Sequence, residues 1–508
     1  MATCSFCRST LVREGEVLRR IGESAELFDD HSPLGLGTRG VHAGVSFTLV
    51  GRLQYSYTDD TGPSPSQGRW TAWHALFDNG RSAILSEDNG RHVMSWPQAL
   101  PELPPDLDTS VPGLQYVLLG RTWSMANRVT ARVHAMQGEW PCVPRTDQGF
   151  DVWELRNEQG EVMTIEASTR PPQVDVGTAV RLADLRLSGL PQPDTDKPQL
   201  KAQGLSCPAC GSSLQPTLDS TQSIVCGSCK AVVDISKGLG ADLAFFKQDN
   251  KLPPLIALGS RGKLSLGGVP VAWQVVGYQE RRSIPVSADE ECWYWREYLL
   301  YEPQEGFAFL VDALDGWSIV QPITGAPRAG GERLTFQGVT YRRKDEAYAA
   351  ETTYVLGEFY WPVRKQQKSL NTDFQGTGDQ AQRVLNREMA GNEVNWSAGR
   401  TLTADDVMQA FRIPAPQREA FVRDASVSSS QWSATTVLII LVIVILVVMI
   451  MANGCEERCG RVRDTYGESS QEYQQCRASS QSSGGGSGGS WSSSGGSYGG
   501  YSSGGSHK

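Results

Sequence analysis

The sequence predicts a mainly β protein, in which tandem antiparallel β-sandwich or barrel modules are combined with a zinc ribbon and one C-terminal transmembrane helix. Three features carry this prediction: an internal repeat, four cysteines in two close pairs, and a continuous apolar run before a tail rich in Gly and Ser. A chain of 508 residues has room for several folded units. Its net charge of −9 argues against nucleic acid as a partner, because a protein that coats nucleic acid needs a basic surface.

The internal repeat is visible as a self-match at a constant spacing. The segment Leu36–Gly40 (LGTRG) returns 222 residues later as Leu258–Gly262 (LGSRG). The same spacing relates four further pairs of residues, namely Cys4 and Cys226, Cys7 and Cys229, Glu166 and Glu388, and Gly177 and Gly399. Chance supplies single matches but not several at one spacing. The pattern therefore indicates two copies of one module of roughly 150 to 170 residues.

Within each copy, short runs alternate apolar and polar residues and are rich in aromatic and β-branched side chains. This pattern, with Gly, Asp and Asn between the runs, is typical of antiparallel β-structure in a sandwich or a partly closed barrel. The clearest runs cover 45–53, 115–119, 298–301, 307–311 and 354–363. Helices are predicted only at 379–389 and at 403–411, the second of which opens with a Thr cap and two acids.

These patterns divide the chain into seven regions. The predicted regions are a half zinc ribbon with its lead-in at 1–29, a first β-rich module at 30–190, a linker at 191–204, a zinc ribbon at 205–235, a second β-rich module at 240–425, a transmembrane helix at 434–452, and a disordered Gly/Ser-rich tail at 453–508.

The zinc ribbon is predicted from four cysteines spaced as C-x2-C-x15-C-x2-C. They are Cys207, Cys210, Cys226 and Cys229. Each C-x2-C knuckle turns so that its two thiolates point the same way, and two knuckles together complete a tetrahedral shell of four sulfurs. Because all four ligands are cysteines, no coordination site is left open, so the expected cofactor is a structural Zn²⁺ ion.

A second, incomplete cysteine pair lies at the N-terminus. Cys4 and Cys7 align with the second knuckle of the ribbon, and the matching first knuckle would fall before the start of the sequence. The sequence leaves two alternatives open. In one, the first copy also had a ribbon whose first half was lost or is encoded upstream of the assigned start, and this pair is a metal site. In the other, the pair is a vestige that binds no metal.

A single membrane span is predicted at the apolar run. Every residue from Val437 to Met451 is apolar, and uncharged neighbours extend the run to 434–452. About 19 helical residues cross a hydrocarbon core of ~30 Å. The alternative, a buried core helix or strand, fits less well because a core strand would be shorter and because a Gly/Ser-rich tail follows.

The orientation of this span rests on two opposing arguments. Arg458, Arg461 and Arg463 follow the run closely, which by the positive-inside rule would place the tail in the cytosol. That orientation would require the export of the large N-terminal region without a signal peptide. Reduced zinc-binding thiols are also simpler to keep in the cytosol. We therefore expect a single-pass protein of a cytoplasmic membrane, with its N-terminal bulk in the cytoplasm.

No catalytic motif stands out. The six histidines form no metal-binding or nucleophile-activating pattern, and the Gly-rich segment 325–331 lacks the ending of a phosphate-binding loop. Carboxylates are the remaining candidates: Glu166 and Glu388 occupy equivalent places in the two copies, and Glu297 follows a Trp-rich segment. A Glu in a β-module is more often solvated or ion-paired than catalytic, so no catalytic residue is assigned.

The two modules together resemble an uncharacterised bacterial family, domain of unknown function 4178. The resemblance lies in the LGTRG and LGSRG openings, the aromatic segment 293–301, the run Gly357–Trp361 and the turn Asn395–Ser397, and it is weaker in the first copy, where Gly138–Trp140 replaces the longer run. It implies a β-rich module beside zinc ribbons and a membrane segment, and a bacterial membrane-stress or envelope context. It implies no catalytic residues.

The expected function is that of a membrane-anchored, non-enzymatic binding or scaffolding protein of the bacterial inner membrane, with structural zinc and protein partners. The alternative is an enzyme that uses carboxylates of the β-modules on a small or membrane-proximal substrate. Converging acids with strongly shifted pKa values in a pocket of both modules would favour the enzyme. The sequence names no small-molecule ligand.

Overall fold

The computed structural model describes residues 32–423 with short gaps, the backbone of three N-terminal strands, and the isolated positions 463, 471 and 474. The gaps are 60–65, 89–90, 101, 142–147, 170, 192–204, 219–220, 236–244, 249–252, 287–290, 331, 364–366 and 392. The chain divides into two units, 1–424 with 496–508 and 425–495, and all named elements lie in the first.

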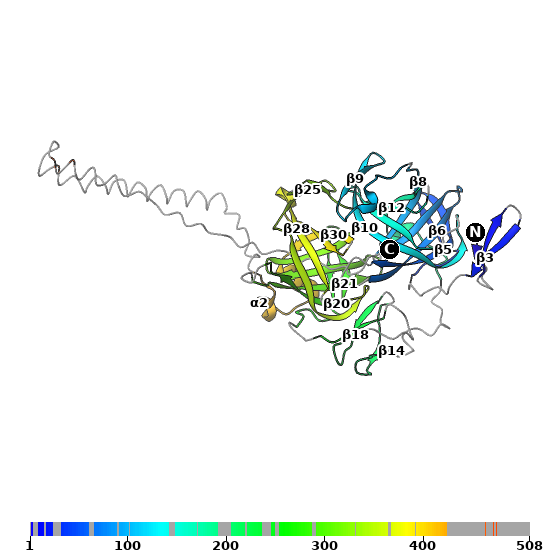
Figure 1. Ribbon diagram of the computed structural model, residues 1–508. Coiled ribbons are helices and arrows are strands. Elements are labelled where there is room, and N and C mark those ends of the chain that lie inside the picture. Colours follow the sequence, from blue (N-terminus) through cyan, green and yellow to red (C-terminus); the bar gives the residue numbers. More distant parts are fainter. Residues whose placement is uncertain are drawn as a thin grey trace. The chain divides into compact units, whose positions relative to one another are not determined.

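The first copy of the repeat is a closed antiparallel barrel (Figure 1, blue to cyan). Its eight strands follow one another around the ring as β5 (Val45–Asp59), β6 (Ser66–Phe77), β7 (Ser82–Asp88), β8 (Arg91–Gln98), β13 (Gln173–Val180), β12 (Glu161–Glu166), β11 (Phe150–Arg156) and β10 (Arg121–Glu139). The ring closes because the long strand β10 pairs with β11 along its first half and with β5 along its second half.

The second copy closes in the same way (Figure 1, green to yellow). Its ring order is β20 (Val271–Ile284), β21 (Tyr294–Glu302), β22 (Gly306–Ala313), β23 (Gly316–Ile323), β30 (Glu393–Leu402), β29 (Arg383–Ala390), β28 (Lys368–Gly376) and β27 (Tyr348–Phe359). Here β27 joins β20 to β28 and closes the ring. The predicted repeat is therefore confirmed as two barrels of the same topology, and closure replaces the open edges of a sandwich.

Shorter elements surround the barrels. They are β1 (Ala2–Thr3), β2 (Ser9–Glu14), β3 (Val17–Glu23), β4 (Arg39–His42), β9 (Gln115–Leu118), β14 (Leu205–Ser206), β15 (Ser213–Leu214), β16 (Ser223–Val225), β17 (Val232–Asp234), β18 (Phe245–Phe246), β19 (Arg261–Leu264), β24 (Arg328–Gly330), β25 (Arg333–Phe336), β26 (Val339–Arg343), the 3-10 turns η1 (Leu107–Thr109), η2 (Leu182–Leu185), η3 (Gly378–Gln380) and η4 (Ala415–Gln417), and the helices α1 (Ala404–Phe411) and α2 (Arg418–Phe421).

The repeated LGTRG and LGSRG segments form the same turn in both copies. Gly37 and Gly259 have φ values of 84° and 82°, which favour glycine. Their N–H groups donate to the backbone carbonyls of Leu49 and Val275 at 2.8 and 2.7 Å, so each turn is hydrogen-bonded to the first long strand of its barrel. The repeated segment therefore serves the fold of each barrel.

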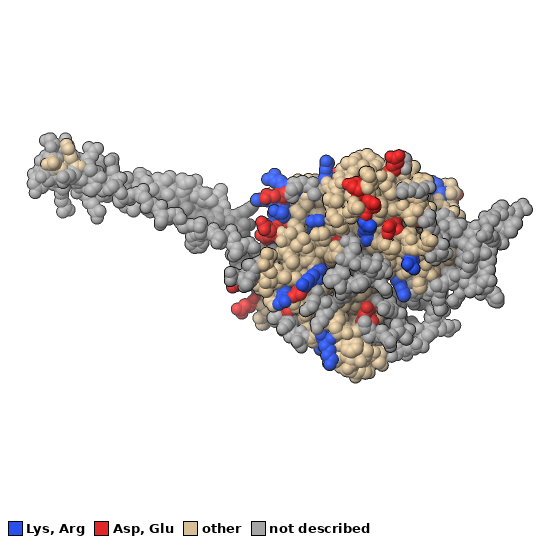
Figure 2. Space-filling view, in the orientation of Figure 1, with Lys and Arg blue, Asp and Glu red and all other residues tan. Residues whose placement is uncertain are grey.

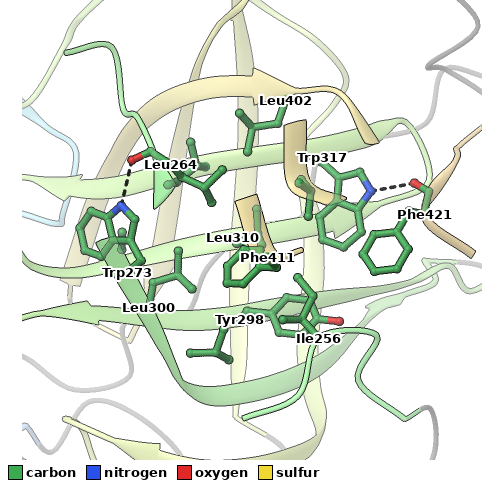
Figure 3. Close-up of a cluster of buried hydrophobic side chains, with 14 of the residues drawn as sticks. Ile256, Leu264, Trp273, Tyr298, Leu300, Leu310, Trp317, Leu402, Phe411 and Phe421 are labelled. Atoms are coloured by element: carbon green, nitrogen blue, oxygen red, sulfur yellow. Dashed lines mark hydrogen bonds between the residues drawn. The ribbon is translucent and has the colours of Figure 1, made fainter. Parts of the chain in front are cut away.

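A large part of the second barrel's core lies between its β20–β23 side and helix α1 (Figure 3). Phe411 of α1 packs here with Leu300 and Leu310. Two indoles satisfy their N–H groups on backbone carbonyls, since Trp273 donates to Leu264 at 3.3 Å and Trp317 to Phe421 at 2.8 Å. The aromatic segments of the repeat therefore contribute to packing.

One predicted helix is confirmed and the other is wrong. Helix α1 begins after Thr403, whose hydroxyl accepts from the Asp406 N–H while the Asp406 carboxylate accepts from the Thr403 N–H. The helix predicted at 379–389 does not form. Its first residues belong to the turn η3, and β29 follows, bonded to β28 on one side and β30 on the other. Pairing with two neighbouring strands outweighs the local helical pattern.

Within the part of the chain that the structure describes, no helix is long and apolar enough to cross a membrane. The predicted span at 434–452 lies outside the described residues, as do Cys4, Cys7 and the tail predicted to be disordered, apart from the three isolated positions.

Candidate metal centre and buried charge cluster

The four cysteines predicted to bind zinc come together at the tips of two hairpins. Their Sγ atoms all lie within 4.8 Å of one another. Gly211 and Lys230 close the two knuckles with positive φ values of 75° and 59°. The Gly211 N–H donates to the Cys207 carbonyl at 2.8 Å, and the Lys230 N–H donates to the Cys226 carbonyl at 3.0 Å. The two C-x2-C turns are thus built alike.

The sulfur geometry fits a tetrahedral metal ion. With metal–sulfur bonds of about 2.3 Å, neighbouring sulfurs in a tetrahedron lie about 3.8 Å apart. The Cys207–Cys229 and Cys210–Cys226 sulfur distances are both 3.7 Å. Burial raises the pKa of Cys207 to about 12, whereas hydrogen bonding with Ser212 lowers the pKa of Cys210 to about 6. The cluster can therefore hold a metal ion such as zinc, which would displace the Cys207 proton.

The cysteine module (205–235) is attached to the second barrel through backbone pairing. Strand β16 lies antiparallel to the end of β27, with Ser223 opposite Phe359 and Ile224 opposite Glu358. Val225 and Val232 of the module join the hydrophobic core that β21, β22 and β27 share. The cysteine module therefore extends the sheet of the second barrel.

One carboxylate fixes the loop between the two knuckles. Glu358 accepts the backbone N–H groups of Thr217 at 2.9 Å and Leu218 at 3.0 Å, and the Thr221 hydroxyl at 2.6 Å. Charge-assisted bonds of this kind are stronger than bonds between neutral groups. Glu358 thereby joins the cysteine module to β27.

We expect Glu358→Gln to destabilise the attachment of the cysteine module by about 1–2 kcal/mol, because the new amide N–H groups face the backbone donors. Amide hydrogen exchange of 213–235 should rise. Glu332→Gln, at an exposed turn position, is the matched control and should change nothing. Equal exchange in both variants would show that Glu358 does not hold the module.

The first barrel carries the backbone of a corresponding half module. Strand β1 pairs with the end of β10, with Ala2 opposite Glu139 and Thr3 opposite Gly138, and β1 also pairs with β2. The pairing of Ala2 with Glu139 corresponds to the pairing of Ile224 with Glu358 between β16 and β27 in the second copy. The predicted alignment of the N-terminal knuckle with the second ribbon knuckle is therefore supported by strand pairing, while metal binding by Cys4 and Cys7 stays a prediction.

A buried charge cluster lies inside the second barrel. Arg281 of β20 is 0% exposed, and its guanidinium lies 3.2 Å from the Glu388 carboxylate and 3.7 Å from that of Glu297. It also donates to Ser369 at 2.6 Å. Because β20 and β29 are not neighbours in the ring, the Arg281–Glu388 contact crosses the barrel interior. The structure thus brings together two of the three carboxylates that the sequence singled out.

The remaining carboxylate bonds are also made inside the protein. Glu297 accepts from the Trp295 indole and from the Gln279 amide, both at 2.6 Å. Asp373 accepts from Tyr348 at 2.9 Å and from Asn386 at 2.7 Å. These carboxylates accept hydrogen bonds from side chains of the same barrel, as in a structural network.

The first barrel replaces this cluster with apolar side chains. The strand registers place Tyr55, Ala72 and Phe150 at the positions of Arg281, Glu297 and Ser369. They also place Val152 at the position of Asn371, whose amide donates to Ser369 at 3.0 Å. Tyr55 stacks on Trp70 with ring centroids 4.6 Å apart and packs against the hydrophobic cluster of Phe150 and Val152, and also against the neighbouring cluster of Ala72. Glu166, the counterpart of Glu388, is only partly buried. The barrel topology therefore does not require the charges.

Burial shifts the pKa values of the acids. It raises the pKa of Glu297 to about 8, against the opposing effect of Arg281, and that of Asp373 to about 7. One guanidinium faces both Glu297 and Glu388, so the trio is neutral when one carboxyl keeps its proton. This explains the direction of the Glu297 shift.

The raised pKa of Glu297 predicts how stability changes with pH. Between its ordinary value of 4.5 and about 8 the folded state holds a proton that the unfolded state has released. Stability contributed by this group is therefore complete below 4.5 and is lost as the pH rises to about 8, by up to about 1.4 kcal/mol per pH unit. Chemical denaturation of wild type and Glu297→Gln across this window measures the effect. A stability difference between them that is constant with pH would contradict it.

Together, the fold and the site define a tandem β-barrel protein with a four-cysteine module that can hold a metal ion. The family model described as Domain of unknown function (DUF4178) matches residues 35–182 and 265–404, which cover most of the two barrels. These matches span more than half of the chain, so the chain belongs to this family and carries two copies of its domain. No curated protein and no solved structure matches the chain.

Proposed function

We propose that the protein is a membrane-anchored, non-enzymatic binding or scaffolding protein of a bacterial inner membrane, with structural zinc in the cysteine module and the barrels in the cytoplasm. The observation that carries this proposal is the closed four-cysteine shell built into the sheet of the second barrel. A metal held by four cysteines stabilises a fold and leaves no position for a substrate. The apolar run at 434–452 supplies the anchor.

The alternative enzyme is less well supported. Glu297 and Asp373 of the second barrel have raised pKa values, and Glu297 shares the Arg281 guanidinium with Glu388, but these acids are buried and bonded to internal donors. The first barrel has Ala72 at the position of Glu297, while Glu154, at the position of Asp373, is buried in a salt bridge with Arg156. An enzyme duplicated with its site would keep converging acids in both copies. The charges of the described surface in Figure 2 are of mixed sign, which suits a protein partner better than nucleic acid.

Cross-linking in cells followed by isolation of the full chain in mild detergent tests the scaffolding role. We expect a defined set of membrane-associated proteins to be enriched over an unrelated single-span control protein, and to be diminished in Cys226→Ser, which loses the cysteine module. A wild-type chain that enriches nothing beyond the control would contradict the proposal.

A further inference from the structure

Two arginines lie directly opposite each other on the second barrel. Arg383 begins β29, and the strand register places it across from Arg400 of β30. Directly opposite residues in an antiparallel pair point to the same face with Cβ atoms about 5 Å apart. Like charges at this spacing destabilise a sheet, and this pair is partly buried, where water screens the repulsion less than at an exposed site.

Backbone carbonyls of one turn fix both guanidinium groups. Arg400 Nε donates to the Ser265 carbonyl at 2.8 Å, and Arg383 Nη1 lies 3.5 Å from the Leu266 carbonyl. The turn is held in shape by the Ser265 hydroxyl, which donates to the Gly268 carbonyl at 2.6 Å and accepts from the Gly267 N–H at 3.1 Å. Both arginines are partly buried, and both are bonded to this one turn.

The arginine pair is not neutralised by an acid of the described residues. Neither guanidinium forms a salt bridge there, whereas Arg281, Arg296 and Arg423 of the same barrel each face a carboxylate. Every guanidinium carries five N–H donors, and the two carbonyls use only a small share of them. Two fixed positive charges with spare donors are therefore presented next to each other.

The first copy shows that the fold does not demand this pair. Its equivalent positions on β12 and β13 carry Glu161 and Thr178, which also lie opposite each other. Glu161 forms a salt bridge with Arg121 and accepts from the Asn157 amide at 2.6 Å. The same backbone thus holds a neutralised acid in the first barrel and two unneutralised bases in the second.

We propose that Arg383 and Arg400 form a binding site for a phosphate group. Planar guanidinium groups match the oxygens of phosphate with pairs of parallel N–H bonds, and two of them side by side balance its double negative charge. Lys263 of β19, two residues before Ser265, is exposed and adds positive charge to this segment. The phosphate belongs either to the headgroup of an anionic lipid or to a soluble phosphate compound.

Calorimetric titration of the full chain in a neutral detergent tests this site and separates the two sources. One arm uses inorganic phosphate and the other uses short-chain phosphatidic acid. We expect Arg383→Gln/Arg400→Gln to weaken binding at least about tenfold. Binding of phosphatidic acid alone assigns the site to lipid headgroups, and comparable binding of both probes assigns it to phosphate as such.

The matched control is Arg333→Gln/Arg342→Gln. These two arginines also lie opposite each other, on β25 and β26, but both are exposed and no described carbonyl fixes them. Failure of the wild type to bind either probe, or an equal loss in the control, overturns the proposal. Should Arg383→Gln/Arg400→Gln unfold, Arg383→Lys/Arg400→Lys keeps both charges without the planar fork and should still weaken binding; undiminished binding by that variant would also overturn the proposal.

Discussion

Replacing Arg281 with Met is expected to destabilise the second barrel by about 3–5 kcal/mol, because it leaves the Glu297 and Glu388 carboxyls buried without their cation. The effect should appear as a lower midpoint of chemical denaturation and as faster hydrogen exchange in β20, β21 and β29. Arg333→Met, at an exposed position, is the matched control and should cost little.

Removing the charges together is expected to cost less than removing Arg281 alone. The variant Arg281→Tyr/Glu297→Ala/Glu388→Gln takes the first-barrel residues at two positions and neutralises the third. A buried ion cluster can often be exchanged for uncharged residues at little cost, whereas breaking it is expensive. A combined variant that is less stable than Arg281→Met would contradict this account of the cluster.

Loss of a metal ligand is also expected to have a large effect, on both the metal content and the folding of the cysteine module. Cys226→Ser should abolish binding of one zinc ion per chain and unfold the cysteine module, since the metal supplies most of the folding free energy of such a small unit, on the order of 10 kcal/mol. Elemental analysis of the purified chain measures the metal. Hydrogen exchange should increase in β16 and β17, and also at the end of β27 that pairs with β16.

The control for this substitution is Cys292→Ser, at an exposed cysteine away from the cluster. It should retain the metal and the exchange pattern of the wild type. Unchanged zinc content in Cys226→Ser would exclude the cysteine cluster as the metal site.

The four-cysteine cluster was the part of the site that the sequence predicted best. The spacing of Cys207, Cys210, Cys226 and Cys229 is a local property, and the structure places the four sulfurs at distances that suit one ion. Attachment of this module to β27 through Glu358 could not be predicted, because it depends on a pairing between segments more than a hundred residues apart.

Strand content and the repeat were also predictable, while closure of the barrels was not. Alternation identifies strands, but the pairing of β10 with β5 and of β27 with β28 is decided by tertiary structure. The helix predicted at 379–389 failed for the same reason. Arg281 was missed because it lies in a continuous polar run, 279–283, that resembles exposed chain, and the structure buries most of that run.

Fractionation of cells that express the full chain tests whether the protein is anchored in the membrane with its barrels in the cytoplasm. We expect the protein to stay with the inner membrane after an alkaline wash and external protease applied to spheroplasts to spare both barrels. Deletion of 434–452 should release the chain into the soluble fraction. A wild-type chain that is washed off the membrane, or barrels that external protease digests in intact spheroplasts, would contradict a membrane-anchored cytoplasmic platform.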